Sequence, residues 1–124
     1  MQTKKRILVI EDDELIADFL RRLLEDLDQS VVVARDGQEG LDRARSCPPD
    51  LILLDLSLPI VDGWELARQL KTDPVTWRIP LIAVTGANRY GEDSDGEDGL
   101  DGFVEKPFEV RDLEDKLLSF LTRV

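Results

Sequence analysis

Five short apolar runs without polar alternation constrain the fold of this chain more than any other feature. Short runs rich in Val, Ile and Leu are typical of strands buried on both faces, because a solvent-exposed face would bring in alternating polar residues. A parallel sheet covered on both sides also needs helices in the connections between its strands. The runs are residues 7–10, 31–34, 51–54, 81–84 and 103–104.

Segments with apolar residues at helical spacing separate these runs. Strands that alternate with such segments form right-handed βαβ units around a parallel sheet. Pro48 and Pro49 end the second helical segment, while Gly37 and Gly63 indicate loops. We therefore expect one open five-stranded α/β domain over residues 1–124, a length that suits a single core. The expected apolar helix faces consist of Leu15, Ile16, Phe19, Leu20, Leu23, Leu24 and Leu27, of Leu66 and Leu70, and of Val110, Leu113, Leu117 and Leu121.

The connection between the fourth and fifth runs breaks this pattern. Tyr90 is its only sizeable apolar side chain, and Gly91 and Gly96 each disfavour a helix by about 1 kcal/mol relative to Ala. Six acids and no base lie between residues 92 and 101, so a helix here would also place like charges one turn apart. We predict that the fourth helix is degenerate or replaced by an irregular acidic loop over much of residues 88–98.

The composition excludes several kinds of chemistry. The chain has no histidine and one cysteine, Cys47. It therefore offers no Ser-His or Cys-His nucleophile pair, no imidazole metal ligand, no internal disulfide and no cysteine-based zinc site. Carboxylates, hydroxyls and lysines must carry whatever chemistry occurs. The net charge of -11 argues against nucleic acid and anionic membranes as direct partners, since both require a basic face.

The hydropathy pattern argues against a membrane protein. No apolar run approaches the roughly 18 residues that a membrane-spanning helix needs. The run at residues 7–10 is also too short for the core of a signal peptide. We therefore expect a cytoplasmic protein.

Polar residues stand where the expected strands end. Glu11 and Asp12 follow the first run, Asp55 the third and Thr85 the fourth, and Lys106 comes after the fifth. Parallel strands share one carboxyl edge, so Asp12 and Asp55 converge if the first and third strands are neighbours. Converging carboxylates repel each other, and Mg²⁺ relieves that repulsion while leaving room for a phosphate oxygen. An aspartate can attack phosphorus where cations and hydroxyls surround the phosphoryl oxygens.

The motifs at these strand ends resemble those of the response-regulator receiver domain. They stand at Glu11-Asp12, in residues 55–63 with the sequence DLSLPIVDG, at Thr85, and in residues 103–108 with the sequence FVEKPF. The resemblance extends from about residue 5 to the end of the chain. It implies a flavodoxin-like sheet with the strand order 2-1-3-4-5 and helices on both faces.

This resemblance also implies a role for each motif residue. Asp55 would be the phosphoacceptor, and a histidine kinase or a histidine phosphotransfer protein would supply the phosphoryl group. Lys106 would pair with that group, and its peptide bond to Pro107 would be cis. The remaining implied roles are Mg²⁺ binding by Glu11, Asp12, Asp55 and the backbone carbonyl of Ser57, and a switch formed by Thr85 and Phe103 that changes a protein-binding surface.

Several of these residues also have simpler interpretations. Asp13 favours a cap or first-turn role for the helix that begins near residue 14. Asp62, with Glu65 three residues later, reads as a capping box for the third helix. Thr85 could be an ordinary β-branched strand residue and Lys106 a solvated surface lysine.

Two other functions fit part of the pattern. An aspartyl-phosphate phosphatase of the haloacid dehalogenase type also uses an Asp nucleophile and magnesium. That family needs a second Asp two residues after the nucleophile, where this chain has Ser57. An interaction module that is never phosphorylated also fits, because intact motifs do not prove turnover. The favoured hypothesis is a signalling receiver that is phosphorylated on Asp55 and is not itself an enzyme acting on a separate substrate.

Overall fold

The computed structural model describes residues 4–56, 63–85, 100–105 and 109–121. For Thr85 and Glu105 only the backbone is described. The predictions that lie outside the described residues concern Ser57 as a metal ligand, the capping box of Asp62, the irregular acidic loop over residues 88–98, and Lys106 with its bond to Pro107.

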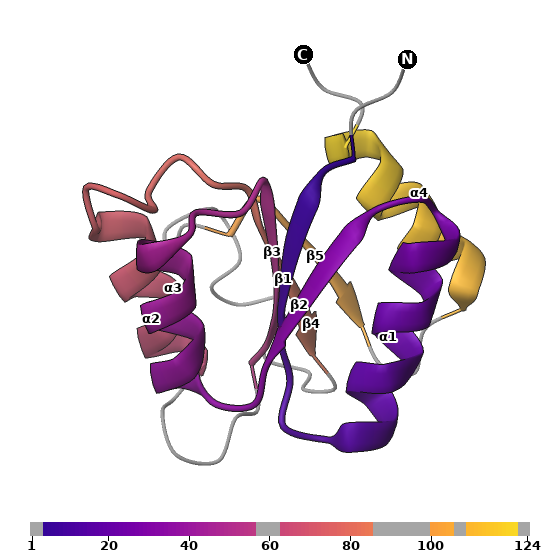
Figure 1. Ribbon diagram of the computed structural model, residues 1–124, viewed down its shortest axis with the longest axis horizontal. Coiled ribbons are helices and arrows are strands. Elements are labelled where there is room, and N and C mark those ends of the chain that lie inside the picture. The colour runs from indigo at the N-terminus through magenta and orange to yellow at the C-terminus, as the bar shows by residue number, and fades with distance from the viewer. Residues whose placement is uncertain (1–3, 57–62, 86–99, 106–108, 122–124) are drawn as a thin grey trace.

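Five parallel strands form a single sheet (Figure 1). The order of the strands is β2-β1-β3-β4-β5, so the predicted sheet and its order are confirmed. In this order β1 and β3 are neighbours, with Ile10 opposite Leu54. The strands are β1 (Arg6–Ile10), β2 (Ser30–Ala34), β3 (Leu51–Asp55), β4 (Leu81–Thr85) and β5 (Gly102–Glu105).

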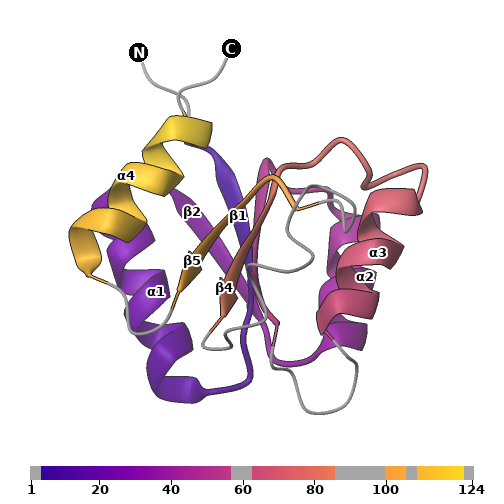
Figure 2. The same ribbon diagram turned by 180° about the vertical axis from the view of Figure 1, so that it is seen from behind.

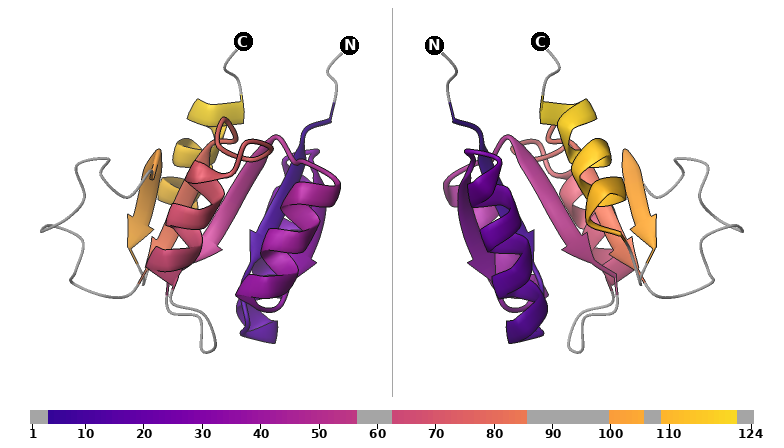
Figure 3. Two further views of the ribbon diagram at one scale, coloured as in Figure 1. Left: turned by 90° about the vertical axis from the view of Figure 1, so that its left-hand side faces the viewer. Right: turned by 90° about the vertical axis from the view of Figure 1, so that its right-hand side faces the viewer.

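Four helices in the described residues cover both faces of this sheet. Figures 1 and 2 show α1 and α4 on one face and α2 and α3 on the other, and the two side views of Figure 3 agree. The helices are α1 (Glu14–Asp26), α2 (Gly37–Ser46), α3 (Gly63–Thr72) and α4 (Val110–Leu121). Gly37 and Gly63, which the sequence marks as loop positions, are instead the first residues of α2 and α3.

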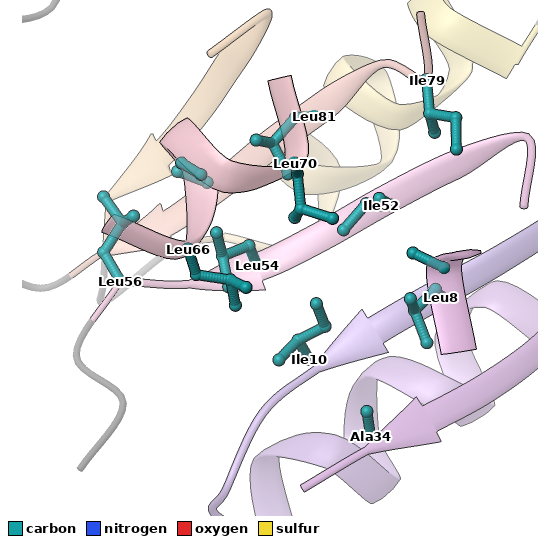
Figure 4. Packing of buried hydrophobic residues seen from close by; sticks show 13 residues of the cluster. Leu8, Ile10, Ala34, Ile52, Leu54, Leu56, Leu66, Leu70, Ile79 and Leu81 are labelled. Carbon is teal, nitrogen blue, oxygen red and sulfur yellow. The ribbon is translucent and has the colours of Figure 1, made fainter. Parts of the chain in front are cut away.

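The core has two halves, one on each side of the sheet. Successive strand residues point to opposite faces, so each strand contributes to both halves. Ile7, Val9 and Leu53 pack beneath α1 and α4. Leu8, Ile10 and the β3 residues that alternate with Leu53 pack beneath α2 and α3 (Figure 4). All five residues of β3 are buried, because this central strand has neighbours on both sides and helices on both faces.

Aspartates cap the amino ends of two of the helices. The Asp13 carboxylate accepts hydrogen bonds from the backbone N–H groups of Leu15 at 2.9 Å and Ile16 at 3.2 Å. The Asp36 carboxylate accepts one from the backbone N–H of Glu39 at 2.8 Å. Such bonds satisfy N–H groups that have no partner within the helix. The capping role predicted for Asp13 is thereby confirmed.

Among the residues predicted to be buried, four are exposed: Leu15, Phe19, Val32 and Val110. Leu15 is 83% exposed and Phe19 is 41% exposed, because only one stripe of α1 contacts the sheet. Val110, in the first turn of α4, is exposed for the same reason. Val32 is exposed because β2 is an edge strand, which neighbouring strands and helices cover less completely than β3. None of the described helices has both the length and the apolar character required to span a membrane.

Candidate functional site

Three carboxylates meet at the carboxyl edge of the sheet. Glu11 and Asp12 directly follow β1, and Asp55 is the last residue of the neighbouring strand β3. One carboxylate oxygen from each of the three lies within 4.8 Å of those from the other two. The expected convergence of Asp12 and Asp55 is therefore present, and Glu11 joins it.

The three acids differ in their contact with solvent. Glu11 and Asp55 are buried, at 1% and 5% exposed, whereas Asp12 is exposed. Burying ionised carboxylates close together is unfavourable, since each loses hydration and repels the others. The cluster therefore concentrates negative potential at a point that solvent reaches from the side of Asp12. An arrangement of this kind is suited to binding a cation.

Local contacts fix the backbone on either side of the cluster. The backbone N–H of Glu11 donates to the Ala34 carbonyl oxygen at 3.0 Å, which continues the pairing of β1 with β2. The Glu11 carboxylate accepts a hydrogen bond from the backbone N–H of Asp13 at 3.2 Å. Because Asp13 also caps α1, the two acids after β1 are held between a strand end and a helix start.

A close approach of α3 fixes the chain after Asp55. A Cβ atom added to Gly63 would lie 2.5 Å from both the Cα atom and the carbonyl oxygen of Leu56. Leu56 also donates its backbone N–H to the Val84 carbonyl oxygen at 3.3 Å. Only glycine leaves enough space for this contact between the start of α3 and the end of β3. Sequence reasoning missed this role, although the position of a glycine just after a strand-end motif is a signal that could have suggested it.

The donor set fits a hard divalent cation. Carboxylate oxygens are the ligands that Mg²⁺ and Ca²⁺ prefer, and Mg²⁺ needs only one or two of them together with water and a phosphate oxygen. Two buried acids and one exposed acid leave one side of the cluster open to such a group. The chemistry of these residues therefore agrees with the predicted magnesium site.

Two other predicted site residues, Thr85 and Phe103, belong to β4 and β5, the two strands that follow β3 in the sheet. The Thr85 backbone ends β4, the neighbour of β3, and pairs with Glu105 of β5. Phe103 is partly buried and packs against the core half beneath α2 and α3, as Trp64 does. The structure does not describe the Thr85 hydroxyl, Ser57 or Lys106, so their roles remain predictions.

Comparison with known sequences identifies close relatives of this chain. Residues 7–118 match the response regulator receiver domain family. The polar-differentiation response regulator DivK of Brucella anthropi is 36% identical over 118 residues, which cover 94% of this chain and 96% of that relative.

Comparison with solved structures gives the same fold. A CheY-like response regulator receiver domain protein from Methanospirillum hungatei JF-1 has a TM-score of 0.85 at 32% identity, over 96% of this chain and 94% of that one. The receiver domain of the sensor histidine kinase PA1611 from Pseudomonas aeruginosa PAO1 also has a TM-score of 0.85, at 24% identity, over 98% of this chain and 100% of that one. That structure holds a magnesium ion in its active-site cleft.

Proposed function

Because this chain belongs to the response regulator receiver domain family of two-component signalling, we propose that Asp55 accepts a phosphoryl group from a phosphohistidine on a partner protein. A receiver is a signalling domain rather than an enzyme with a separate substrate. The observation that carries the proposal is the convergence of Glu11, Asp12 and Asp55 at the carboxyl edge of the sheet. Asp55 is the member of this cluster that ends β3, a strand in which all five residues are buried.

The transfer forms one bond to phosphorus and breaks another. A carboxylate oxygen of Asp55 attacks the phosphorus atom while the bond from phosphorus to the histidine nitrogen breaks. The electron pair of that bond returns to the imidazole, and the nitrogen can then take a proton from solvent. Asp55 becomes an acyl phosphate, and hydrolysis by water later restores the carboxylate. The burial of Asp55 keeps its oxygens in one place for the attack.

Glu11, Asp12 and Asp55 would hold Mg²⁺, together with the backbone carbonyl of Ser57. When bound, the ion supplies positive charge next to the phosphoryl oxygens and offsets the repulsion between phosphate and carboxylate. Lys106 and the Thr85 hydroxyl would contact the remaining phosphoryl oxygens. Inward movement of that hydroxyl would let Phe103 change its packing, which would alter the protein-binding surface.

The partner is a histidine kinase or a histidine phosphotransfer protein, which the family implies in general terms. Exposed apolar side chains in the first turns of α1 would contact this partner protein beside the acidic cluster. Leu15 and Phe19 lie one helical turn apart and are both exposed, and Leu15 is only three residues from Asp12. Together they give an approaching helix an apolar surface next to the acceptor. We therefore expect Leu15→Asp to slow transfer from a phosphohistidine protein by about tenfold, while labelling by acetyl phosphate is unchanged.

Intact mass after incubation with acetyl phosphate and Mg²⁺ tests the phosphorylation site directly. The wild-type protein should gain about 80 Da, and hydroxylamine should remove this label because it cleaves acyl phosphates. Asp55→Asn should gain nothing. Labelling of Asp55→Asn at the wild-type rate would exclude Asp55 as the acceptor. A wild-type protein that takes no label would favour the alternative of an unphosphorylated interaction module.

Three further points concern the phosphatase alternative, the extent of the domain and the location of the protein. An aspartyl-phosphate phosphatase of the haloacid dehalogenase type is disfavoured because Ser57 replaces the required second aspartate. Residues 1–124 as one receiver domain and a cytoplasmic location remain proposals that suit a partner of the histidine kinase class.

A further inference from the structure

A small apolar and cationic surface lies at the amino edge of the sheet, opposite the three carboxylates. Val75 and Trp77 are each 49% exposed. The guanidinium carbon of Arg78 lies 4.9 Å from the centre of the Trp77 ring, which is a cation–π contact. These three residues form what we call the Trp77 patch. They belong to the connection between α3 and β4, at the upper left of Figure 1.

Hydrogen bonds fix the backbone beneath this patch. The Asp73 carbonyl oxygen accepts the backbone N–H groups of Thr76 at 3.2 Å and Trp77 at 3.0 Å. The Asp73 carboxylate accepts the backbone N–H of Val75 at 2.7 Å. Each N–H at the start of the turn therefore has a defined acceptor, and the backbone is held in one conformation.

Two neighbours of the patch residues in the sequence, Thr76 and Ile79, are buried. Thr76 is fully buried, and its hydroxyl donates to the Leu70 carbonyl oxygen at 2.6 Å. Ile79 is also buried, and its backbone N–H donates to the Thr76 carbonyl oxygen at 3.0 Å. A buried threonine between two exposed apolar residues presents Val75 and Trp77 on a rigid base. Little conformational entropy would be lost when a partner covers them.

The charge of the patch differs from that of the chain as a whole. The Asp73 carboxylate is only 13% exposed and pairs with Arg45 at 3.0 Å, so it does not neutralise Arg78. Within the part of the chain that the structure describes, Arg78 has no ion-pair partner and only its contact with Trp77. The net charge of the chain is -11, whereas the patch carries a positive charge that no ion pair among the described residues neutralises.

We propose that the Trp77 patch binds a short segment of another protein in which carboxylates flank an apolar side chain. The apolar side chain would cover Trp77 and Val75, and a carboxylate would pair with Arg78. Trp and Arg are enriched among the residues that dominate binding energy at interfaces. A second copy of this chain fits less well, because two copies repel each other and three residues are far fewer than the 20–30 per side of a standard interface.

The patch lies before β4, whereas Asp55 ends β3 at the other edge of the sheet. Binding there leaves the acidic cluster accessible, so the segment would bind independently of phosphorylation. The site therefore goes beyond the proposed phosphoacceptor function and does not depend on it.

Peptide arrays can test this proposal without knowledge of the natural partner. One array holds peptides of about 12 residues built from Asp, Glu, Leu, Phe and Ser, and a matched array replaces each acid by Lys or Arg. The best binder is then labelled with fluorescein, and the protein is titrated into it with fluorescence anisotropy as the readout. Because the label is on the peptide, the same measurement applies to wild type and to every variant, including Trp77→Ala.

We expect the acidic peptides to bind and the basic ones to bind at least about tenfold more weakly. Trp77→Ala and Arg78→Glu should each weaken binding by about tenfold or more, with no change in labelling by acetyl phosphate. Val32→Ala and Arg22→Glu alter an exposed valine and an exposed arginine elsewhere and should bind like wild type. Asp55→Asn should also bind like wild type.

Three results would overturn the proposal. They are an absence of binding to any acidic peptide, equal binding of the basic array, and unchanged binding by Trp77→Ala. Binding that Asp55→Asn abolishes would also overturn the claim of independence from phosphorylation, whatever the acetyl phosphate experiment shows.

Discussion

At the amino edge of the sheet, aspartates lie beside hydrogen-bond donors and cations. The Asp101 carboxylate accepts the backbone N–H of Leu81 at 2.8 Å and the Lys71 ammonium at 2.9 Å. The Asp73 carboxylate accepts a backbone N–H and pairs with Arg45, as described above. The Asp50 carboxylate likewise has a hydrogen-bond donor, because it accepts the backbone N–H of Arg6 at 2.8 Å.

At the carboxyl edge three acids lie beside one another. Glu11, Asp12 and Asp55 bring carboxylate oxygens within 4.8 Å of each other. The same type of side chain thus serves two purposes, and its neighbours distinguish them. Acids with donors stabilise the folded chain, whereas acids gathered together stabilise a bound cation at some expense to the fold. Removing one of these amino-edge acids should therefore lower stability, whereas removing Asp12 from the cluster should not.

Asp101→Ala should have the largest effect on stability. The substitution leaves the Leu81 N–H without its acceptor. The Lys71 ammonium, which is only 17% exposed, loses its charged partner and keeps the Ile79 carbonyl oxygen as an acceptor. We expect the free energy of unfolding to fall by about 2 kcal/mol, measured by urea denaturation. Asp101→Asn keeps an acceptor oxygen and should lose about half as much. If Asp101→Ala is as stable as wild type, the comparison between the two edges is wrong.

Asp73→Ala should have a smaller effect in the same direction. The Val75 N–H loses its acceptor, but the neighbouring region is partly open to water, which can replace it. We expect a loss of about 1 kcal/mol in the same urea measurement. Asp73→Asn is the control, because it retains the turn hydrogen bond and removes only the ion pair with Arg45. Equal losses from the two substitutions would assign the effect to the ion pair and not to the turn.

Asp12→Ala should show the smallest effect and the opposite sign. Without metal, the substitution removes a charge from a repelling cluster, so the melting temperature in EDTA should equal or exceed that of wild type. The gain should be at most about 0.5 kcal/mol because Asp12 is exposed, and added salt should reduce it. With Mg²⁺ present, wild type should gain more stability than the variant, and its phosphorylation should be faster. A clearly lower melting temperature in EDTA would make Asp12 a structural residue.

The sequence predicted most of the fold because burial on both faces leaves a strong signal. Strands such as β3 contain little but aliphatic residues, and Asp13 has the expected chemistry of a helix cap. The predictions failed where burial depends on tertiary position. Val32 has the composition of a core residue but lies on an edge strand, and Leu15 continues an apolar face that the sheet does not reach.

The sequence also predicted the convergence at the candidate site, since the resemblance to a known family implied that β1 and β3 are neighbours. It could not predict the contact of Gly63 with Leu56, which depends on how closely α3 approaches β3. Nor could it predict that Thr76 is buried while Trp77 is exposed, the reverse of what hydrophobicity suggests. The Thr76 hydroxyl can be buried because it donates a hydrogen bond to the Leu70 carbonyl oxygen.

The complete burial of β3 has a consequence for the kinetics of the molecule. Amides of a strand paired on both sides exchange their hydrogens with solvent only when a large part of the protein opens. Leu53 and Leu54 should therefore exchange at the rate set by global unfolding, and Asp55 is attached directly to this slowest region. The carboxylate that we propose as the phosphoacceptor thus rests on the part of the chain that should open least often. Spontaneous local opening of β3 should be too rare to set the lifetime of an acyl phosphate on Asp55, so this lifetime would depend on the chemistry of the folded site.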